Sequence, residues 1–109
     1  MKEPYITVLY KAPGREPELK PLFENSLAAF QNAVGGYIET VTVTSDMVIV
    51  CNEEGRINGM PFNVKFLNWD FHGPILIVGT KEEDFASFPL IFLPFILNAM
   101  EAGESHAQL

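Results

Sequence analysis

One cysteine and two histidines are the side chains of this sequence that could act as a nucleophile and a general base. In such a pair the imidazole removes the thiol proton, and the thiolate then attacks an electrophilic substrate. Cys51, however, ends a continuous apolar run that starts at Met47, and a thiol in that position is typically an inert core group. His72 stands beside a Gly-Pro pair, and His106 lies near the end of the chain. We therefore predict no catalytic residues and no enzymatic activity.

The acidic pair Glu53-Glu54 lies in a polar loop that runs from Asn52 to Gly55. Two carboxylates can bind a divalent cation or share the roles of acid and base. Adjacent side chains of a turn point apart, however, and no further ligand recurs at a usable spacing. We predict no metal site and no cofactor. The single cysteine also excludes an internal disulfide and a cysteine-based zinc site.

The same polar loop has two other interpretations. Asn52 and Asn63 can hydrogen-bond to the backbone of their own loops, which would make them structural residues. Alternatively, the loop and Asn63 form a small-molecule binding site. That candidate site consists of Asn52, Glu53, Glu54, Gly55 and Asn63.

Charge and hydropathy argue against several classes of function. Fourteen acidic and seven basic side chains give a net charge of −7, which repels a phosphate backbone and argues against nucleic-acid binding through a basic face. The longest apolar stretch, Phe88–Ala99, is shorter than the roughly 20 residues that span a bilayer, so we predict no membrane span. The N-terminal residues do not resemble a signal peptide, and we expect a cytoplasmic protein.

The elements that must position these residues follow from the apolar pattern. A helix over Glu18–Val34 is predicted by apolar residues that recur at helical spacing, namely Leu22, Phe23, Leu27, Phe30 and Val34. Strands are predicted over residues 5–10, 37–43, 47–51, 64–67 and 75–79, with 37–43 and 47–51 as a hairpin and 75–79 in the middle of the sheet. Residues 69–74 and 80–87 are expected to be loops.

Two adjacent glycines follow the predicted helix. Gly35 stands where a left-handed C-cap is expected, and Gly36 allows the chain to turn sharply into the next strand.

The C-terminal segment Phe88–Met100 is apolar nearly all round. We favour a helix from Phe88 or Pro89 to Ala102 with a bend at Pro94, and the alternative is a helix that Pro94 opens and that ends near Gly103. A helix without a polar face must be buried on more than one side, which predicts contact with a second copy or another protein. The predicted interface consists of Phe88, Leu90, Ile91, Phe92, Phe95 and Ile96.

These elements predict an α+β fold in one domain over residues 1–103, with a frayed tail over 104–109. The expected architecture has two layers, in which two helices pack against a mainly antiparallel sheet of four or five strands. The strand order is left open.

Three short motifs carry a resemblance that extends over almost the whole chain. They are Val34–Glu39 with the pattern V-G-G-x-I-E, Asn52–Gly55, and Pro61–Asn63. Together they resemble an uncharacterised bacterial family of domains of about a hundred residues, found in gut Firmicutes, phages and plasmids. The resemblance marks Gly35, Gly36, Glu39 and Pro61 as structural motif positions and implies no established activity.

The sequence thus favours a non-enzymatic accessory or protein-interaction module that self-associates, encoded in a bacterial or mobile-element genome. The first alternative is the small-molecule site around Asn52–Gly55 and Asn63. The second is an enzyme that pairs His72 with Cys51 or Asp70, or an acidic decoy of nucleic acid, although no acidic run exceeds the three residues 82–84.

Overall fold

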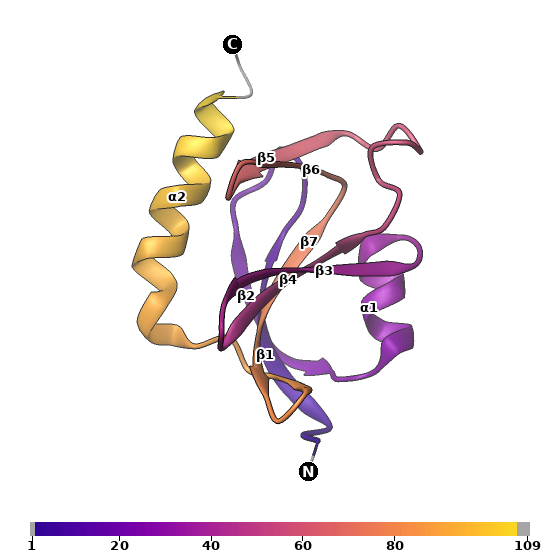
Figure 1. Ribbon diagram of the computed structural model, residues 1–109, viewed down its shortest axis with the longest axis vertical. Helices are drawn as coiled ribbons and strands as arrows, with labels where there is room; N and C mark the ends of the chain where they lie inside the picture. Colours follow the sequence, from indigo (N-terminus) through magenta and orange to yellow (C-terminus); the bar gives the residue numbers. More distant parts are fainter. Residues whose placement is uncertain (1, 107–109) are drawn as a thin grey trace.

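The computed structural model describes residues 2–106 and has an antiparallel sheet at its centre (Figure 1). The strand order is β2-β1-β7-β4-β3, and a short strand β8 pairs with β7. These strands are β1 (Tyr5–Lys11), β2 (Glu18–Glu24), β3 (Ile38–Thr44), β4 (Met47–Asn52), β7 (Ile75–Lys81) and β8 (Asp84–Ala86). The other elements are α1 (Leu27–Val34), the hairpin of β5 (Phe62–Phe66) and β6 (Trp69–His72), the 3-10 turn η1 (Leu90–Phe92) and α2 (Leu93–His106).

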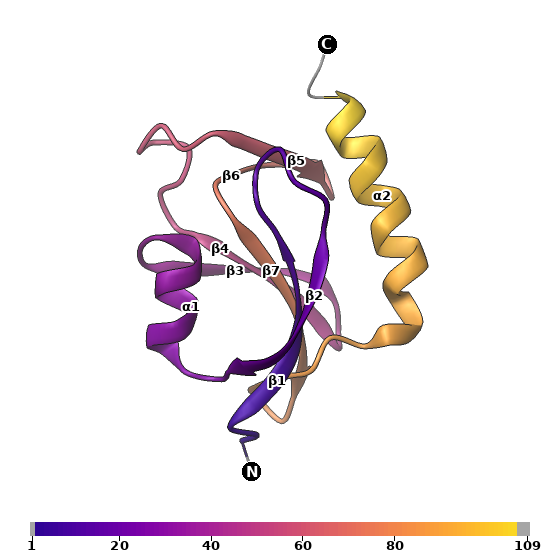
Figure 2. The ribbon, with the colours of Figure 1, turned by 180° about the vertical axis from the view of Figure 1, so that it is seen from behind.

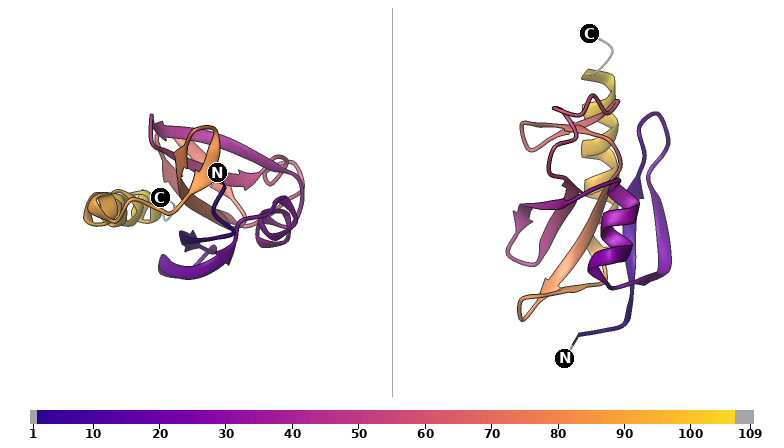
Figure 3. Two further views of the ribbon diagram at one scale, coloured as in Figure 1. Left: turned by 90° about the horizontal axis from the view of Figure 1, so that it is seen from below. Right: turned by 90° about the vertical axis from the view of Figure 1, so that its right-hand side faces the viewer.

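Both faces of the central sheet are buried, because its strands carry apolar side chains on both sides. Phe30 and Val34 of α1 cover one face, which presents Ile6, Val8, Val50, Leu76 and Val78. Ile96 and Met100 of α2, together with the β5–β6 hairpin, cover the other face, which presents Leu9, Met47, Ile49, Cys51, Ile75 and Ile77. The views from behind and from below show the two helices on opposite sides of the strands (Figures 2 and 3).

The predicted α+β class, with a mainly antiparallel sheet and two helices, is confirmed. The prediction of β7 in the middle of the sheet is confirmed by its pairing with both β1 and β4, and β3 and β4 form the predicted hairpin. Instead of lying in one layer, the helices lie on opposite faces of the sheet. The sheet also gains a sixth strand, β8, because residues 84–86 pair with the end of β7 where a loop was expected.

The helix predicted over Glu18–Val34 was wrong in its first part, because residues 18–24 form the edge strand β2. Pro21 has no N–H to donate and is tolerated at a sheet edge. Leu22 has φ of 57° and its side chain is 80% exposed, so it does not belong to a buried helical stripe. The helix begins after Ser26, whose Oγ accepts a hydrogen bond from the Ala29 N–H at 3.1 Å, the N-cap arrangement.

The end of this helix agrees with the prediction. Gly35 is its left-handed C-cap, with φ of 80°, and the Gly35 N–H donates to the Gln31 carbonyl at 2.8 Å.

The favoured C-terminal helix, bent at Pro94, was also wrong. Residues 90–92 form η1, and α2 begins at Leu93, so Pro94 lies in the first helical turn, where its missing N–H costs no hydrogen bond. Gly103 does not end the helix. A Cβ on Gly103 would collide with the Lys65 carbonyl, so this glycine lets α2 pack directly against β5.

Three smaller results complete the fold. Residues 69–72, expected to be a loop, form β6. Residues 104–106 of the predicted tail belong to α2, and 107–109 lie outside the described residues. Over residues 2–106, neither helix has the length and apolar composition required to cross a membrane.

Candidate functional site

The two motif glycines and Asn52 form a joint between α1 and β4. Asn52, at the end of β4, donates from Nδ2 to the Val34 carbonyl at the end of α1 over 3.1 Å. Its Oδ1 accepts from the Glu54 N–H at 2.7 Å, which fixes the loop that follows. A Cβ on Gly36 would lie 2.8 Å from Asn52 Nδ2, so a side chain at position 36 would displace this amide. Asn52 therefore hydrogen-bonds to the backbone of its own loop and to the end of α1.

A second joint connects the polar loop to the β5–β6 hairpin. A Cβ on Gly55 would collide with the His72 carbonyl, so glycine permits the loop to lie directly against β6. The Met60 side chain packs over Gly35, Gly55 and Gly73, with its sulfur 2.5 Å from the position of a Cβ on Gly73. Gly55 has no positive φ, so glycine is required here for this close approach and not for a left-handed turn.

Asn63 is buried, with 3% exposure, and joins β5 to two other segments. Its Nδ2 donates to the Lys11 carbonyl at 2.8 Å and to the Gly73 carbonyl at 2.9 Å. Its Oδ1 accepts from the buried Lys11 Nζ at 2.9 Å. All three bonds are internal, so Asn63 stabilises the packing of the hairpin on the sheet.

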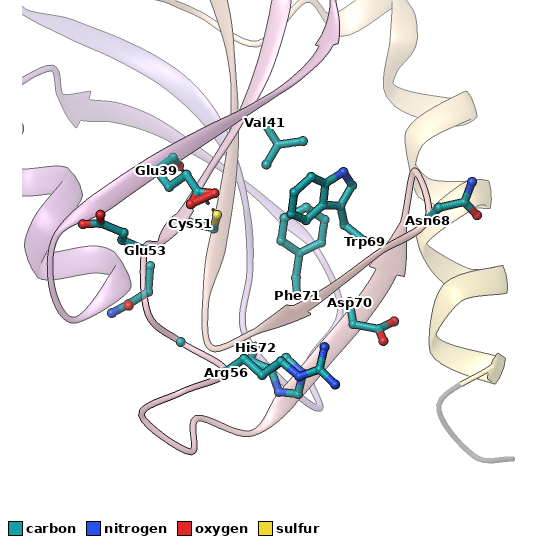
Figure 4. A pocket seen from close by; sticks show the side chains of 12 residues that line it. Glu39, Val41, Cys51, Glu53, Arg56, Asn68, Trp69, Asp70, Phe71 and His72 are labelled. Carbon is teal, nitrogen blue, oxygen red and sulfur yellow. Dashed lines mark hydrogen bonds between the residues drawn. The ribbon is translucent and has the colours of Figure 1, made fainter.

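Beside these joints, a cavity of about 330 Å³ opens between the β3–β4 edge and β6 (Figure 4). Glu39, Val41 and Cys51 line one side of it, and Trp69 and Phe71 line the other. The remaining lining residues are Asn52, Glu53, Gly55, Arg56, Asn68, Asp70 and His72.

The ionisable side chains of the cavity carry an excess of negative charge. Glu39, Glu53 and Asp70 are exposed carboxylates, and Arg56 is the guanidinium among the lining residues. Asp70 also forms a loose ion pair with Lys65 at 3.8 Å. The Trp69 indole is 53% exposed and offers an aromatic face beside these carboxylates. The arrangement suits a ligand group that combines positive charge with an aliphatic stem.

Cys51 and His72 line the same cavity, but each is engaged with the backbone. The Cys51 thiol donates to the Glu39 carbonyl at 3.6 Å. Burial, with a smaller contribution from the negative charge of Glu39, raises the pKa of Cys51 to about 11, so the thiol stays protonated at neutral pH. His72 Nδ1 lies 3.2 Å from the Met60 carbonyl. Neither group has the geometry of an activated nucleophile or its base.

Of the residues predicted to form a binding site, Asn52, Glu53 and Gly55 line the cavity. Glu54 is exposed and lies outside the lining, and Asn63 is buried in its internal contacts. No group of three or more histidine, cysteine or carboxylate side chains within residues 2–106 is arranged to hold a metal ion. Of the structural motif positions, Glu39 contributes to the cavity, and Pro61 accepts a backbone hydrogen bond from Gly73 at 2.8 Å.

The prediction from sequence missed Trp69, Asp70 and Arg56 as residues of this cavity. Trp69-Asp70-Phe71-His72 alternates aromatic and polar residues between two turns, which is the period of a strand. That alternation was the available signal, since it places Trp69 and Phe71 on one face. Arg56 carried no such signal, because its position depends on the contact between Gly55 and β6.

A second candidate surface lies at the start of α2. Leu90, Ile91, Phe92 and Phe95 are exposed, and they are called the α2 patch below. Phe88 and Ile96, which were also predicted to form an interface, are buried in the core of their own chain. Of the six residues predicted to form an interface, the four of the α2 patch are therefore the ones exposed to a partner.

A family model described as "Domain of unknown function (DUF3846)" matches residues 6–91, and the chain belongs to this family. The match includes the two joints and the cavity, whereas α2 lies beyond it. No curated protein and no solved structure matches the chain.

Proposed function

We propose that this member of the DUF3846 family is a protein-interaction module that associates with a second copy of itself through the α2 patch. Four large apolar side chains lie exposed within the six residues from Leu90 to Phe95. Exposed apolar surface of this density marks interaction sites in soluble proteins. We also expect an accessory role in the cytoplasm. The sequence resemblance adds only the expectation of a bacterial or mobile-element genome.

The charge distribution permits a second copy as the partner at this surface. The chain has a net charge of −7, so most contacts between two copies place like charges together. The segment Phe88–Met100 contains no charged residue. Two copies can therefore meet at the α2 patch without electrostatic repulsion at the centre of the contact, which is the composition of the core of protein interfaces.

Sedimentation velocity over a range of concentrations tests this proposal with a matched pair of variants. Ile91 is 85% exposed in the α2 patch, and Ile57 is 82% exposed in the loop on the opposite side of the molecule (Figure 1). Both changes to glutamate add the same charge and remove the same side chain. Ile91→Glu should weaken self-association by about 30-fold or more, since a central apolar anchor contributes about 2 kcal/mol or more. Ile57→Glu should leave it unchanged, and a wild-type protein that stays monomeric contradicts the proposal.

A second candidate function, small-molecule binding, is supported by the cavity that includes Asn52 and Glu53. Thermal-shift measurements with small cationic compounds test it. A rise in Tm that Glu53→Gln abolishes and Glu54→Gln preserves would support binding in the cavity, because Glu54 is the neighbouring glutamate but does not line the cavity. Equal effects of the two substitutions would count against it.

A further inference from the structure

The two edges of the central sheet differ in how they are protected. At one edge, β2 contains Pro21, and the next residue, Leu22, has a positive φ. The register of β2 with β1 is also irregular. These are features that block the addition of another strand. At the other edge, β3 has the sequence I-E-T-V-T-V-T, without proline or lysine. Its register with β4 is regular from Ile38 to Thr42. The β3 edge is therefore open to pairing.

The hydrogen-bonding direction along β3 can be derived from one bond. The Glu53 N–H donates to the Tyr37 carbonyl at 2.9 Å, just beyond the ladder of β3 and β4. Hydrogen-bonded and non-bonded pairs alternate in an antiparallel ladder. The N–H and C=O groups of Glu39 and Val41 therefore point to β4, and those of Ile38, Thr40 and Thr42 point outward. Within residues 2–106, β4 is the only strand paired with β3, so the outward groups are available to a further strand.

A strand added at this edge would project alternate side chains toward the cavity. Glu39 and Val41 line the cavity from β3, and Trp69 faces them from β6 (Figure 4). The cavity volume of about 330 Å³ is sufficient for one long side chain. Glu39 and Glu53 outnumber Arg56, and Asp70 is only loosely paired with Lys65, so the cavity favours a cation. The exposed indole of Trp69 can contact both a cation and its aliphatic stem.

We propose that the β3 edge is a strand-addition site for an extended basic segment of a partner protein, with one lysine or arginine side chain of that segment inserted in the cavity beside Trp69. Main-chain hydrogen bonds to Ile38, Thr40 and Thr42 give affinity, and the cavity gives the preference for a basic residue. A second copy of this chain is a poorer occupant. Its own β3 carries Glu39 as the charged residue, which would face the carboxylates of the cavity.

The probe is a short, end-blocked peptide of alternating valine and lysine. Trp69 is the single tryptophan of the chain, so its fluorescence reports on binding in the cavity. We expect a saturable change in emission with the valine–lysine peptide and none with a valine–glutamate peptide. The same basic peptide N-methylated at every residue keeps its charge but has no main-chain N–H to donate to β3, and it should bind about tenfold more weakly or worse.

Protein variants test the same site independently. Glu39→Lys reverses a charge in the cavity, and Glu16→Lys makes the same change in the β1–β2 connection, near the other edge of the sheet. The first should weaken binding of the valine–lysine peptide by about tenfold and the second should not. Thr40→Pro removes an outward N–H, a change that edge strands tolerate, and it should also weaken binding.

Three results would overturn the proposal. They are equal affinities for the plain and N-methylated peptides, equal effects of the two Glu→Lys variants, and a dimer of the wild-type chain that Thr40→Pro dissociates. The last result would assign the β3 edge to a second copy of the chain. Because the N-methylated comparison alters only the peptide, it remains decisive even if a protein variant fails to fold.

Discussion

Asn63→Ala is the substitution that most sharply tests the internal role of this residue. It removes the Nδ2 bonds to the Lys11 and Gly73 carbonyls and the Oδ1 bond from Lys11 Nζ. A buried neutral hydrogen bond contributes about 1 kcal/mol and one to a charged group about 1.5–3 kcal/mol. We therefore expect a loss of about 4 kcal/mol in the free energy of unfolding, a large part of the roughly 5–15 kcal/mol that stabilises a typical domain.

The assay is urea denaturation followed by the fluorescence of Trp69 and by circular dichroism. Asn58→Ala is the matched control, because Asn58 is exposed in the turn before β5. That control should change stability by less than about 0.5 kcal/mol. Coincident transitions by the two methods are required for the two free energies to be compared.

Asn63→Asp separates the amide donors from the oxygen acceptor. The aspartate keeps an oxygen for Lys11, but it turns a carboxylate oxygen toward the two carbonyls that Nδ2 now serves. We expect a destabilisation close to that of Asn63→Ala. If both variants unfold like the wild type, Asn63 is not a structural residue and the reasoning from its contacts is refuted.

Two other predictions concern α2 and the buried thiol. Gly103→Ala should lower the free energy of unfolding, measured in urea, by about 2 kcal/mol or more, because the new Cβ would collide with the Lys65 carbonyl even though alanine favours a helix. As a control, Ala102→Gly at an exposed position should cost only about 1 kcal/mol. A Gly103→Ala variant that is more stable than the wild type would contradict the close packing of α2 on β5. The raised pKa of Cys51, from 9.0 to about 11, means that the stability due to its protonated thiol is complete below pH 9 and is lost as pH rises to about 11. As the pH rises from below 9 to above 11, the unfolding free energy of Cys51→Ala should therefore fall by about 3 kcal/mol less than that of the wild type, and parallel curves would refute the shift.

The fold was predictable from sequence where the spacing of apolar residues agrees with the residues that begin or end an element. Phe30 and Val34 mark the buried stripe of α1, and Gly35 marks its left-handed C-cap. Both signals lie within a few neighbouring residues of the sequence. The first part of that helix was mispredicted because Leu22 and Phe23 continue the same spacing by coincidence. Pro21 and the capping side chain of Ser26 were the local signals that the helix begins later.

The candidate site was less predictable, because it depends on contacts between distant segments. Asn52 could be assigned a structural role from its turn, but its bond to Val34 brings α1 and β4 together across the chain. Gly55 allows the polar loop to pack on β6, and β6 is the strand that carries Trp69 into the cavity lining. Where two backbone segments approach closely, the sequence shows a glycine in one segment, but it does not show which other segment packs against that glycine.

Isotope-filtered NMR can detect contact between two copies through the α2 patch. In a mixture of ¹³C-labelled and unlabelled chains, only contacts between different copies give filtered NOEs. We expect NOEs from the Ile91 methyl groups to the aromatic rings of Phe92 or Phe95 of the other copy. Intermolecular NOEs confined to Val41 and its neighbours on β3, or none at concentrations where the protein sediments as a dimer, would contradict this expectation.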